Sequence, residues 1–197
     1  EMCIRDRDEA VEAPVETPEV RKNQLLAAAI LGKAVRLPDP KLAVEPEHEA
    51  LAQAALERTG LSAGAYLVAC VGHTDWTKVR NWRPQRWAEA LTHWQQAHGR
   101  DILLIGSEAE RAASREVAQL MGDAGARCAE WFGSERGDLA TLLGLIALSR
   151  GYIGRDTGPM HLAAALGKPV LAVFGGGTWP RFCPAVKPSV ALTISVP

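Results

Sequence analysis

Short apolar segments alternate with segments of helical spacing along most of the chain. Residues 66–71 are continuously apolar, which is typical of a strand buried on both faces of a parallel sheet. Residues 101–105 predict a second strand and residues 127–130 a short third one, while residues 151–175 predict a strand, a turn, a short helix and another strand. Helices between such strands make right-handed βαβ crossovers. The chain is therefore predicted to be an α/β domain with a doubly wound, Rossmann-like parallel sheet.

The segments between the expected strands carry the apolar stripes of helices. In the helix that Pro84 opens, Trp87, Leu91 and Trp94 stand at i, i+4 and i+7 and are predicted to face the core. Similar spacing predicts helices over residues 20–34, 47–59, 110–121 and 139–146.

Composition narrows the classes of partner. A formal net charge of −1 argues against a nucleic-acid-binding protein, because such proteins usually show a basic balance. No apolar run approaches the roughly 20 residues of a membrane-spanning helix, so we expect a soluble domain without a transmembrane segment. The four cysteines are scattered and form no C-x-x-C pair. This pattern predicts reduced thiols and a cytoplasmic location, with no metal site and no cofactor.

The turn Asp156-Thr157-Gly158 is the first candidate site. It follows one expected strand and precedes a helix, where backbone N–H groups and the helix dipole attract an anion such as phosphate. His161 falls in the first turn of that helix, within reach of the same point. On the residues alone another interpretation stays open, in which Asp156 or Thr157 only caps the helix, Gly158 serves the turn and His161 is half-buried.

The loop after the first expected strand is the second candidate site. It carries Thr74, Lys78, Arg80 and Arg83 in a chain that is otherwise balanced in charge. Charged bonds from Arg or Lys to phosphate are strong, so this cluster suits a diphosphate, although a solvated basic loop is the plain alternative. Ligands of doubly wound sheets bind at the carboxyl ends of strands, so both candidate sites are expected at the same edge.

Residues 156–169, with the sequence DTGPMHLAAALGKP, and the following Val173-Phe174-Gly175 resemble the C-terminal signature of the heptosyltransferase family, glycosyltransferase family 9. Residues 80–82 and 87–89 resemble that family's K-x-W-P and W/F-A-E segments, in which the lysine contacts the donor phosphates. Arg80 stands where the family usually has lysine. It keeps the charge but not the geometry of a lysine.

The resemblance also implies roles for residues elsewhere in the chain. Thr74 lies near the family's phosphate-contacting threonine. Glu110 ends a segment like the family's glycine-rich turn and is a candidate contact for ribose, although a plain surface glutamate is the alternative. Gly137 begins a segment like the one whose backbone meets the base. With Lys78, Asp156, Thr157, Gly158 and His161, these complete the predicted donor-binding set.

As an expectation, the resemblance makes the chain the C-terminal, donor-binding domain of a GT-B glycosyltransferase. Residues 1–18 would be a disordered or artefactual terminus, residues 19–62 the end of an N-terminal domain with the interdomain linker, and residues 63–197 the nucleotide-sugar-binding domain, truncated at its C-terminus. The general base would belong to the missing domain, so no catalytic residue is expected here.

The implied reaction is the inverting, metal-independent transfer of heptose or a related sugar. The donor would be a nucleotide-diphosphate sugar, typically ADP-linked, and the acceptor a lipopolysaccharide-type glycan at the inner face of the cytoplasmic membrane. Two alternatives remain at this stage, a noncatalytic nucleotide-binding module and a nucleotide-sugar epimerase on the same fold. The epimerase would need a pair of catalytic carboxylates near the turn, and the sequence offers no convincing pair.

Overall fold

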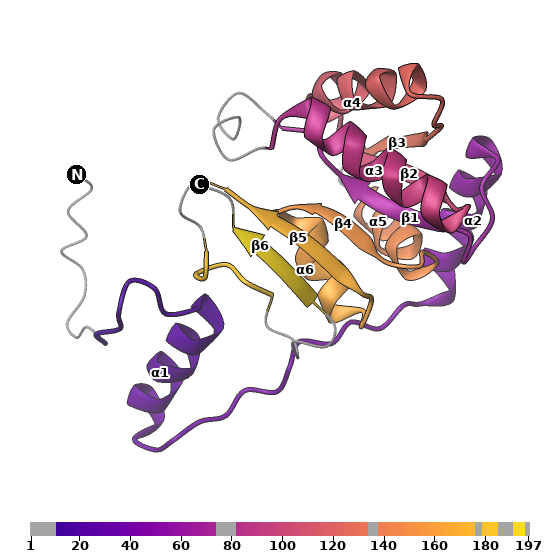
Figure 1. Cartoon of the computed structure of the whole chain (residues 1–197). Helices are drawn as coiled ribbons and strands as arrows, with labels where there is room; N and C mark the ends of the chain where they lie inside the picture. The colour runs from indigo at the N-terminus through magenta and orange to yellow at the C-terminus, as the bar shows by residue number, and fades with distance from the viewer. Residues whose placement is uncertain (1–10, 74–81, 134–137, 176–178, 185–190, 196–197) are drawn as a thin grey trace.

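The computed structural model describes residues 11–73, 82–133, 138–175, 179–184 and 191–195. One sheet organises them, and all its strand pairings are parallel. The strands are β1 (Tyr66–Cys70), β2 (Asp101–Ser107), β3 (Ala129–Gly133), β4 (Tyr152–Arg155), β5 (Val170–Phe174) and β6 (Ala191–Ser195). Their spatial order is β3-β2-β1-β4-β5-β6 (Figure 1). This is the doubly wound, Rossmann-like order, which confirms the predicted fold class. The order in which the chain adds strands changes direction between β1 and β4, which is the switch point where such sheets bind ligands.

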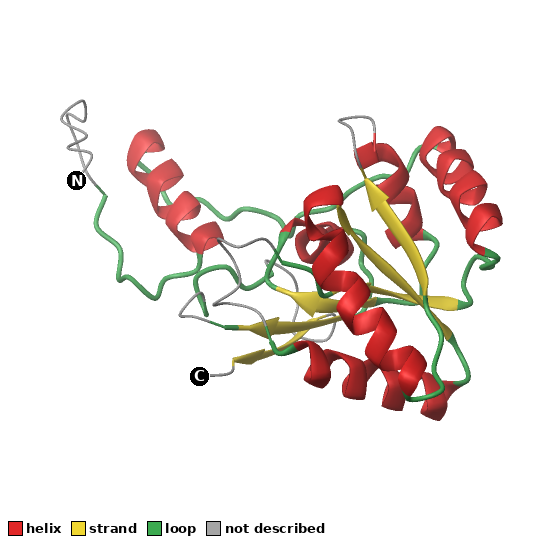
Figure 2. Ribbon diagram, turned by 90° about the horizontal axis from the view of Figure 1, so that it is seen from above, coloured by secondary structure: helices red, strands yellow, loops and turns green. Residues whose placement is uncertain are grey.

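Helices cover both faces of the sheet (Figure 2). They are α1 (Glu19–Leu31), α2 (Pro46–Thr59), α3 (Pro84–His98), α4 (Arg111–Asp123), α5 (Asp138–Ala147) and α6 (Gly158–Ala165), with a 3-10 turn, η2, at Glu108–Glu110. The described part of the chain contains no helix that is both long and apolar enough to cross a membrane.

The hydrophobic core has two layers, one on each face of the sheet. Val68 of β1 faces the layer that α2, α5 and α6 complete. Its neighbour Ala69 faces the layer that α3 and α4 complete, where Trp87 and Leu91 are fully buried as predicted. Successive residues of a strand point to opposite faces. Burial on both faces therefore explains why residues 66–71 are apolar without alternation.

Several expected boundaries moved by a few residues. The third strand lies at Ala129–Gly133 and not at residues 127–130. It is an edge strand of intermediate burial, so its weak apolar pattern did not mark its ends in the sequence. The second strand runs on to Ser107. The helix expected from residue 110 begins at Arg111, after the 3-10 turn.

The first two helices differ in their packing. α2 buries Ala52, Ala55 and Leu56 in the layer that contains α5. A Cβ at Gly144 of α5 would lie 2.1 Å from the backbone oxygen of His48, so only glycine permits this close approach. The core therefore includes α2, N-terminal to residue 63. The assignment of residues 19–62 to the end of another domain stays a prediction.

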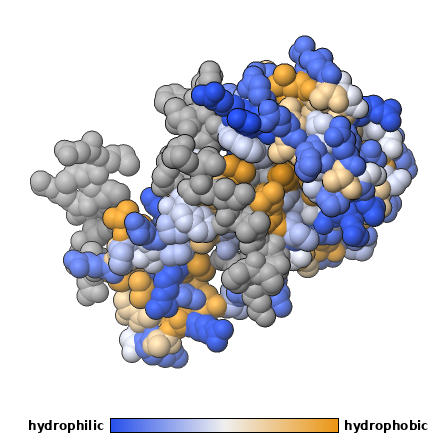
Figure 3. All heavy atoms as spheres, viewed as in Figure 1, coloured by the Kyte–Doolittle hydropathy of each residue, from blue (hydrophilic) through white to orange (hydrophobic). Residues whose placement is uncertain are grey.

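α1 buries no residue and stands apart from the sheet (Figure 1). Leu26, Ile30 and Leu31 are 50%, 75% and 58% exposed, and apolar side chains colour this part of the surface orange in Figure 3. Its contact with the body is polar. Arg181 Nε donates to Glu19 Oε1, and the Glu19 N–H donates to the Arg181 carbonyl over 3.0 Å.

Candidate functional site

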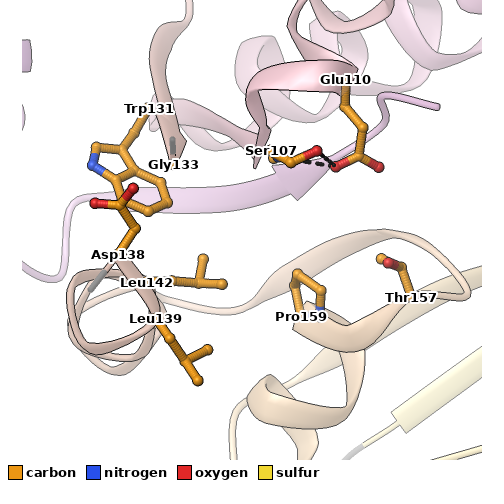
Figure 4. A pocket seen from close by; sticks show the side chains of 10 residues that line it. Ser107, Glu110, Trp131, Gly133, Asp138, Leu139, Leu142, Thr157 and Pro159 are labelled. Carbon is orange, nitrogen blue, oxygen red and sulfur yellow. Dashed lines mark hydrogen bonds between the residues drawn. The ribbon is translucent and has the colours of Figure 1, made fainter. Parts of the chain in front are cut away.

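A cavity of about 550 Å³ opens at the carboxyl edge of the sheet. The ends of β2 and β3, the start of α5 and the turn after β4 form its walls, so segments 50 residues apart meet there (Figure 4). The lining residues are Gly106, Ser107, Glu110, Trp131, Gly133, Asp138, Leu139, Leu142, Thr157 and Pro159. The volume is that of an ordinary small-molecule pocket.

The two sides of this cavity differ in chemistry. Trp131, Leu139 and Leu142 bring apolar surface from β3 and α5, with the Asp138 carboxylate at the edge of the same side (Figure 4). Glu110 and Thr157 bring oxygen atoms from the other side (Figure 4). An aromatic and aliphatic wall suits a planar ring, and a carboxylate accepts hydrogen bonds from hydroxyl groups. The cavity can therefore hold a ligand that joins a flat apolar part to a hydroxylated one.

Glu110 is fixed by bonds to two other segments. Its Oε2 accepts from the Ser107 N–H and from Ser107 Oγ, both over 2.9 Å. Its Oε1 accepts from Arg155 Nη2 over 2.5 Å. The side chain is only 13% exposed, so Glu110 is not a plain surface glutamate. Ser107 and Glu110 form a capping box, whose S-x-x-E pattern was visible in the sequence.

The sequence analysis missed Arg155. This residue ends β4, is 7% exposed and reaches Glu110, which follows β2. Because β1 lies between β2 and β4, the ion pair spans the carboxyl end of β1. A charged residue at the end of the buried segment Tyr152-Ile-Gly-Arg155 was the available signal, since a buried charge needs a partner.

Gly72, just after β1, makes room for this arrangement. A Cβ at this position would lie 2.5 Å from Ser114 Oγ, and 2.8 Å from both the Cβ and the backbone oxygen of Glu110. Distances below 3.0 Å between such atoms are not tolerated, so a side chain at Gly72 would push Glu110 away. The absence of a Cβ at the end of β1 thus lets Glu110 approach the middle of the sheet.

The groups beneath the ion pair are structural. The pKa of the Cys70 thiol is raised to about 12, chiefly by burial and less by the negative charge of Glu110, while Arg155 partly opposes the shift. The thiol therefore stays protonated and is no nucleophile at neutral pH. Burial also raises the pKa of Tyr152, whose hydroxyl donates to the Arg155 carbonyl over 3.1 Å and holds the end of β4 in place.

The turn after β4 holds the other predicted residues. Thr157 is the N-cap of α6, but its side chain makes no capping hydrogen bond, so the interpretation of Thr157 as a side-chain cap does not hold. A Cβ at Gly158 would meet no atom of the described residues within 4 Å. Pro159 is the second residue of α6. The backbone at this turn is open to a ligand.

His161 lies on the exposed side of α6. Partial desolvation lowers the pKa of its imidazole, and the negative charge of Asp156 opposes this shift. Asp156 and His161 are therefore electrostatic neighbours, as the sequence spacing predicted. A bound phosphate near them would favour the protonated imidazole.

Four of the predicted residues, Thr74, Lys78, Arg80 and Gly137, lie outside the described residues. Their roles stay predictions, as do those of Glu110, Asp156, Thr157, Gly158 and His161 in binding a donor. Cys70 pairs with Gly154 in adjacent parallel strands, so the segments after β1 and β4 leave the sheet at the same edge. No group of three or more metal-ligating side chains occurs within the described ranges.

The strand order and the cavity at the carboxyl edge place the molecule in the doubly wound, Rossmann-like class of α/β proteins. Within that class, the chain belongs to glycosyltransferase family 9 (heptosyltransferase), whose family model matches residues 2–195.

Individual relatives agree with this membership. The chain is 30% identical over 119 residues to lipopolysaccharide heptosyltransferase 2 of Escherichia coli K12, an alignment that covers 60% of this chain and 33% of that protein. A family 9 glycosyltransferase from Veillonella parvula DSM 2008 has a similar fold, with a TM-score of 0.74 and 16% identity over 94% of this chain and 51% of that one.

The E. coli heptosyltransferase WaaC with ADP also has a similar fold, with a TM-score of 0.64 and 20% identity over 96% of this chain and 54% of that one. The chain matches about a third of the length of its curated relative and about half of each of these solved chains.

Proposed function

We propose that this chain is the C-terminal, donor-binding part of an inverting, metal-independent glycosyltransferase. It would bind an ADP-linked heptose or a related nucleotide-diphosphate sugar and act on a lipopolysaccharide-type glycan. The observation that carries the proposal is the cavity at the carboxyl edge, where an apolar wall faces a fixed carboxylate beside an open helix N-terminus. Family membership, the E. coli lipopolysaccharide heptosyltransferase 2 and the ADP in WaaC support it.

In this proposal the nucleoside occupies the cavity. Its base lies against Trp131 and Leu142, and its ribose meets Glu110. The expected contact of the Gly137 backbone with the base is part of the proposal, although Gly137 lies outside the described residues. The diphosphate lies over Thr157 and Gly158, because an extended N-cap and an open glycine leave the amino end of α6 accessible.

The remaining predicted residues surround the diphosphate and the sugar. We assign the phosphate contacts to Thr74, Lys78 and Arg80, as the resemblance implies. Asp156 and His161 hold the donor from the turn after β4. Positive charge beside the diphosphate stabilises the charge that grows on the leaving group as the glycosidic bond breaks, which is electrostatic stabilisation of the transition state. The general base and the acceptor site come from an N-terminal domain.

The two N-terminal helices stand differently toward this division. α2 belongs to the core of the sheet domain, whereas α1 presents Leu26, Ile30 and Leu31 to solvent. An apolar helix face of this kind is expected where another domain packs. In this proposal residues 19–62 close the N-terminal domain and link it to residues 63–197, and α2 is the part of that segment that packs on the sheet domain. We place the enzyme in the cytoplasm, in peripheral contact with the inner face of the membrane that carries its acceptor.

Calorimetric titration of the purified chain with ADP, UDP, GDP and NAD tests donor binding. We expect ADP to bind best and Asp156→Ala and Arg80→Ala to weaken it. Asp101→Ala, at the opposite edge of the sheet where β2 begins, is the matched control and should bind as the original chain does. A folded chain that binds none of these nucleotides contradicts the proposal.

A noncatalytic nucleotide-binding module would give the same titrations. A sugar-transfer assay on the full-length parent distinguishes the two, since only the enzyme transfers sugar from its nucleotide donor. Membership of family 9 favours a transferase over the epimerase that the sequence left open.

A further inference from the structure

The carboxylate of Glu110 has little remaining capacity to accept hydrogen bonds. An ionised carboxylate offers about four acceptor positions on its two oxygens. Ser107 fills two positions on Oε2, as the dashed lines in Figure 4 mark. Arg155 fills one position on Oε1. The described residues leave one acceptor position on Oε1, on a side chain that lines the cavity.

Arg155 and Glu110 are tied together by burial. Their side chains are 9% and 13% exposed, so water solvates neither charge well. Each charge therefore depends on the other for its stabilisation. The Nε atom of Arg155 is buried and has no hydrogen-bond partner among the described residues, which makes the bond to Glu110 the more important for this guanidinium. The Tyr152 hydroxyl holds the Arg155 carbonyl, so the base of the arginine is also fixed.

We propose that Arg155 is a positioning residue that holds the Glu110 carboxylate in a single orientation, in which it accepts a hydrogen bond from one ribose hydroxyl of the donor nucleotide. This rests on the proposed function, since it needs a ribose in the cavity. Arg155 does not line the cavity and acts through Glu110. Because one acceptor position remains, Glu110 binds one of the two ribose hydroxyls, and the other hydroxyl does not contribute to affinity through this carboxylate.

Deoxynucleotides test this inference by calorimetry. We expect the original chain to bind one of the two analogues, 2′-deoxy-ADP or 3′-deoxy-ADP, about 10–100-fold more weakly than ADP, the usual effect of losing a hydrogen bond to a charged group. The other analogue should bind as ADP does. In Arg155→Met, the affinity for ADP should fall to the affinity that the original chain has for the weaker analogue. The affinity for that analogue should stay as it is in the original chain. A purely structural role would weaken all three ligands together.

Two further variants control the experiment. Arg150→Met makes the same chemical change at an exposed arginine just before β4, and it should keep both affinity and discrimination. Arg155→Lys keeps a positive charge without the planar guanidinium, so its ratio of ADP to deoxy-analogue affinity should lie between those of Arg155→Met and the original chain. If Arg155→Met fails to fold by near-ultraviolet circular dichroism, the ratio in Arg155→Lys decides, and a ratio equal to the original overturns the inference.

The failures of the two proposals are distinguishable. If the original chain binds no nucleotide, the proposed function fails and the role of Arg155 fails with it. If the chain binds ADP and both deoxy analogues equally, or loses affinity for both, or if Arg155→Met keeps the original ratio, the role of Arg155 is overturned while the proposed function stands.

Discussion

The two sides of the candidate site are built differently. Around Glu110 the groups are buried and bonded to each other, with Ser107 and Arg155 holding the carboxylate from two strands. At the turn after β4, the Thr157 side chain makes no capping bond, and none of the described residues fills the space at Gly158. A group that is already ordered costs little to order on binding, which favours recognition by the first side. The open side leaves room for a ligand to lie on the backbone.

A side chain at Gly72 should have the largest effect, because it would collide with Glu110 on the buried side of the site, which we call the closed side. Gly72→Ala places a Cβ 2.8 Å from the Glu110 backbone oxygen, which cannot rotate away. We expect the free energy of unfolding to fall by about 1–3 kcal/mol, as for other overpacked sites. Urea denaturation measures this change. An unchanged midpoint would show that the closed side is less rigid than its contacts indicate.

Gly158→Ala is the matched substitution on the open side, and its effect should appear in binding and not in stability. No atom of the structure's described ranges lies within 4 Å of the added Cβ, so the urea midpoint should not fall. The methyl group would stand where we propose that the diphosphate lies. ADP affinity should therefore drop by about tenfold, equivalent to roughly 1.4 kcal/mol. Unaltered affinity in calorimetry would place the diphosphate elsewhere.

The smallest expected effect is a dependence on pH at His161. Desolvation lowers the pKa of His161 in the folded protein, so the unfolded chain takes up the proton more readily. Stability from this residue is complete above its unfolded pKa of about 6.5 and is lost as the pH falls toward the lower folded value.

Urea titrations across this pH range measure the effect. His161→Gln should reduce the loss of stability on acidification, whereas His93→Gln, at an exposed position on α3, should leave it unchanged. Bound ADP should raise the pKa of His161, which NMR titration of its ring protons can follow. A His161 pKa that ADP leaves unaltered would separate this residue from the diphosphate.

The sequence predicted the fold class because the information is local. The apolar run of β1 and the stripe of Trp87, Leu91 and Trp94 each lie within a few residues of one another, and burial follows directly from such patterns. The edge strand β3 was placed two or three residues too early for the converse reason. All of its residues are only partly buried, so no strong apolar pattern marked its ends.

The polar turn Asp156-Thr157-Gly158 could also be read from the sequence, since a strand, a turn and a helix start follow one another without interruption. What the chain by itself determined is thus its class of fold, its family signature and the edge of the sheet where a ligand would lie. These depend on residues that are neighbours along the chain.

Tertiary structure alone decided how the cavity is assembled. Glu110 and Arg155 are 45 residues apart and meet because β2, β1 and β4 are adjacent in the sheet. Trp131 joins the wall because β3 pairs with β2, and Gly72 matters because a Cβ there would collide with Glu110. None of these contacts has a local sequence pattern, since each depends on which strands pair and how closely their ends approach.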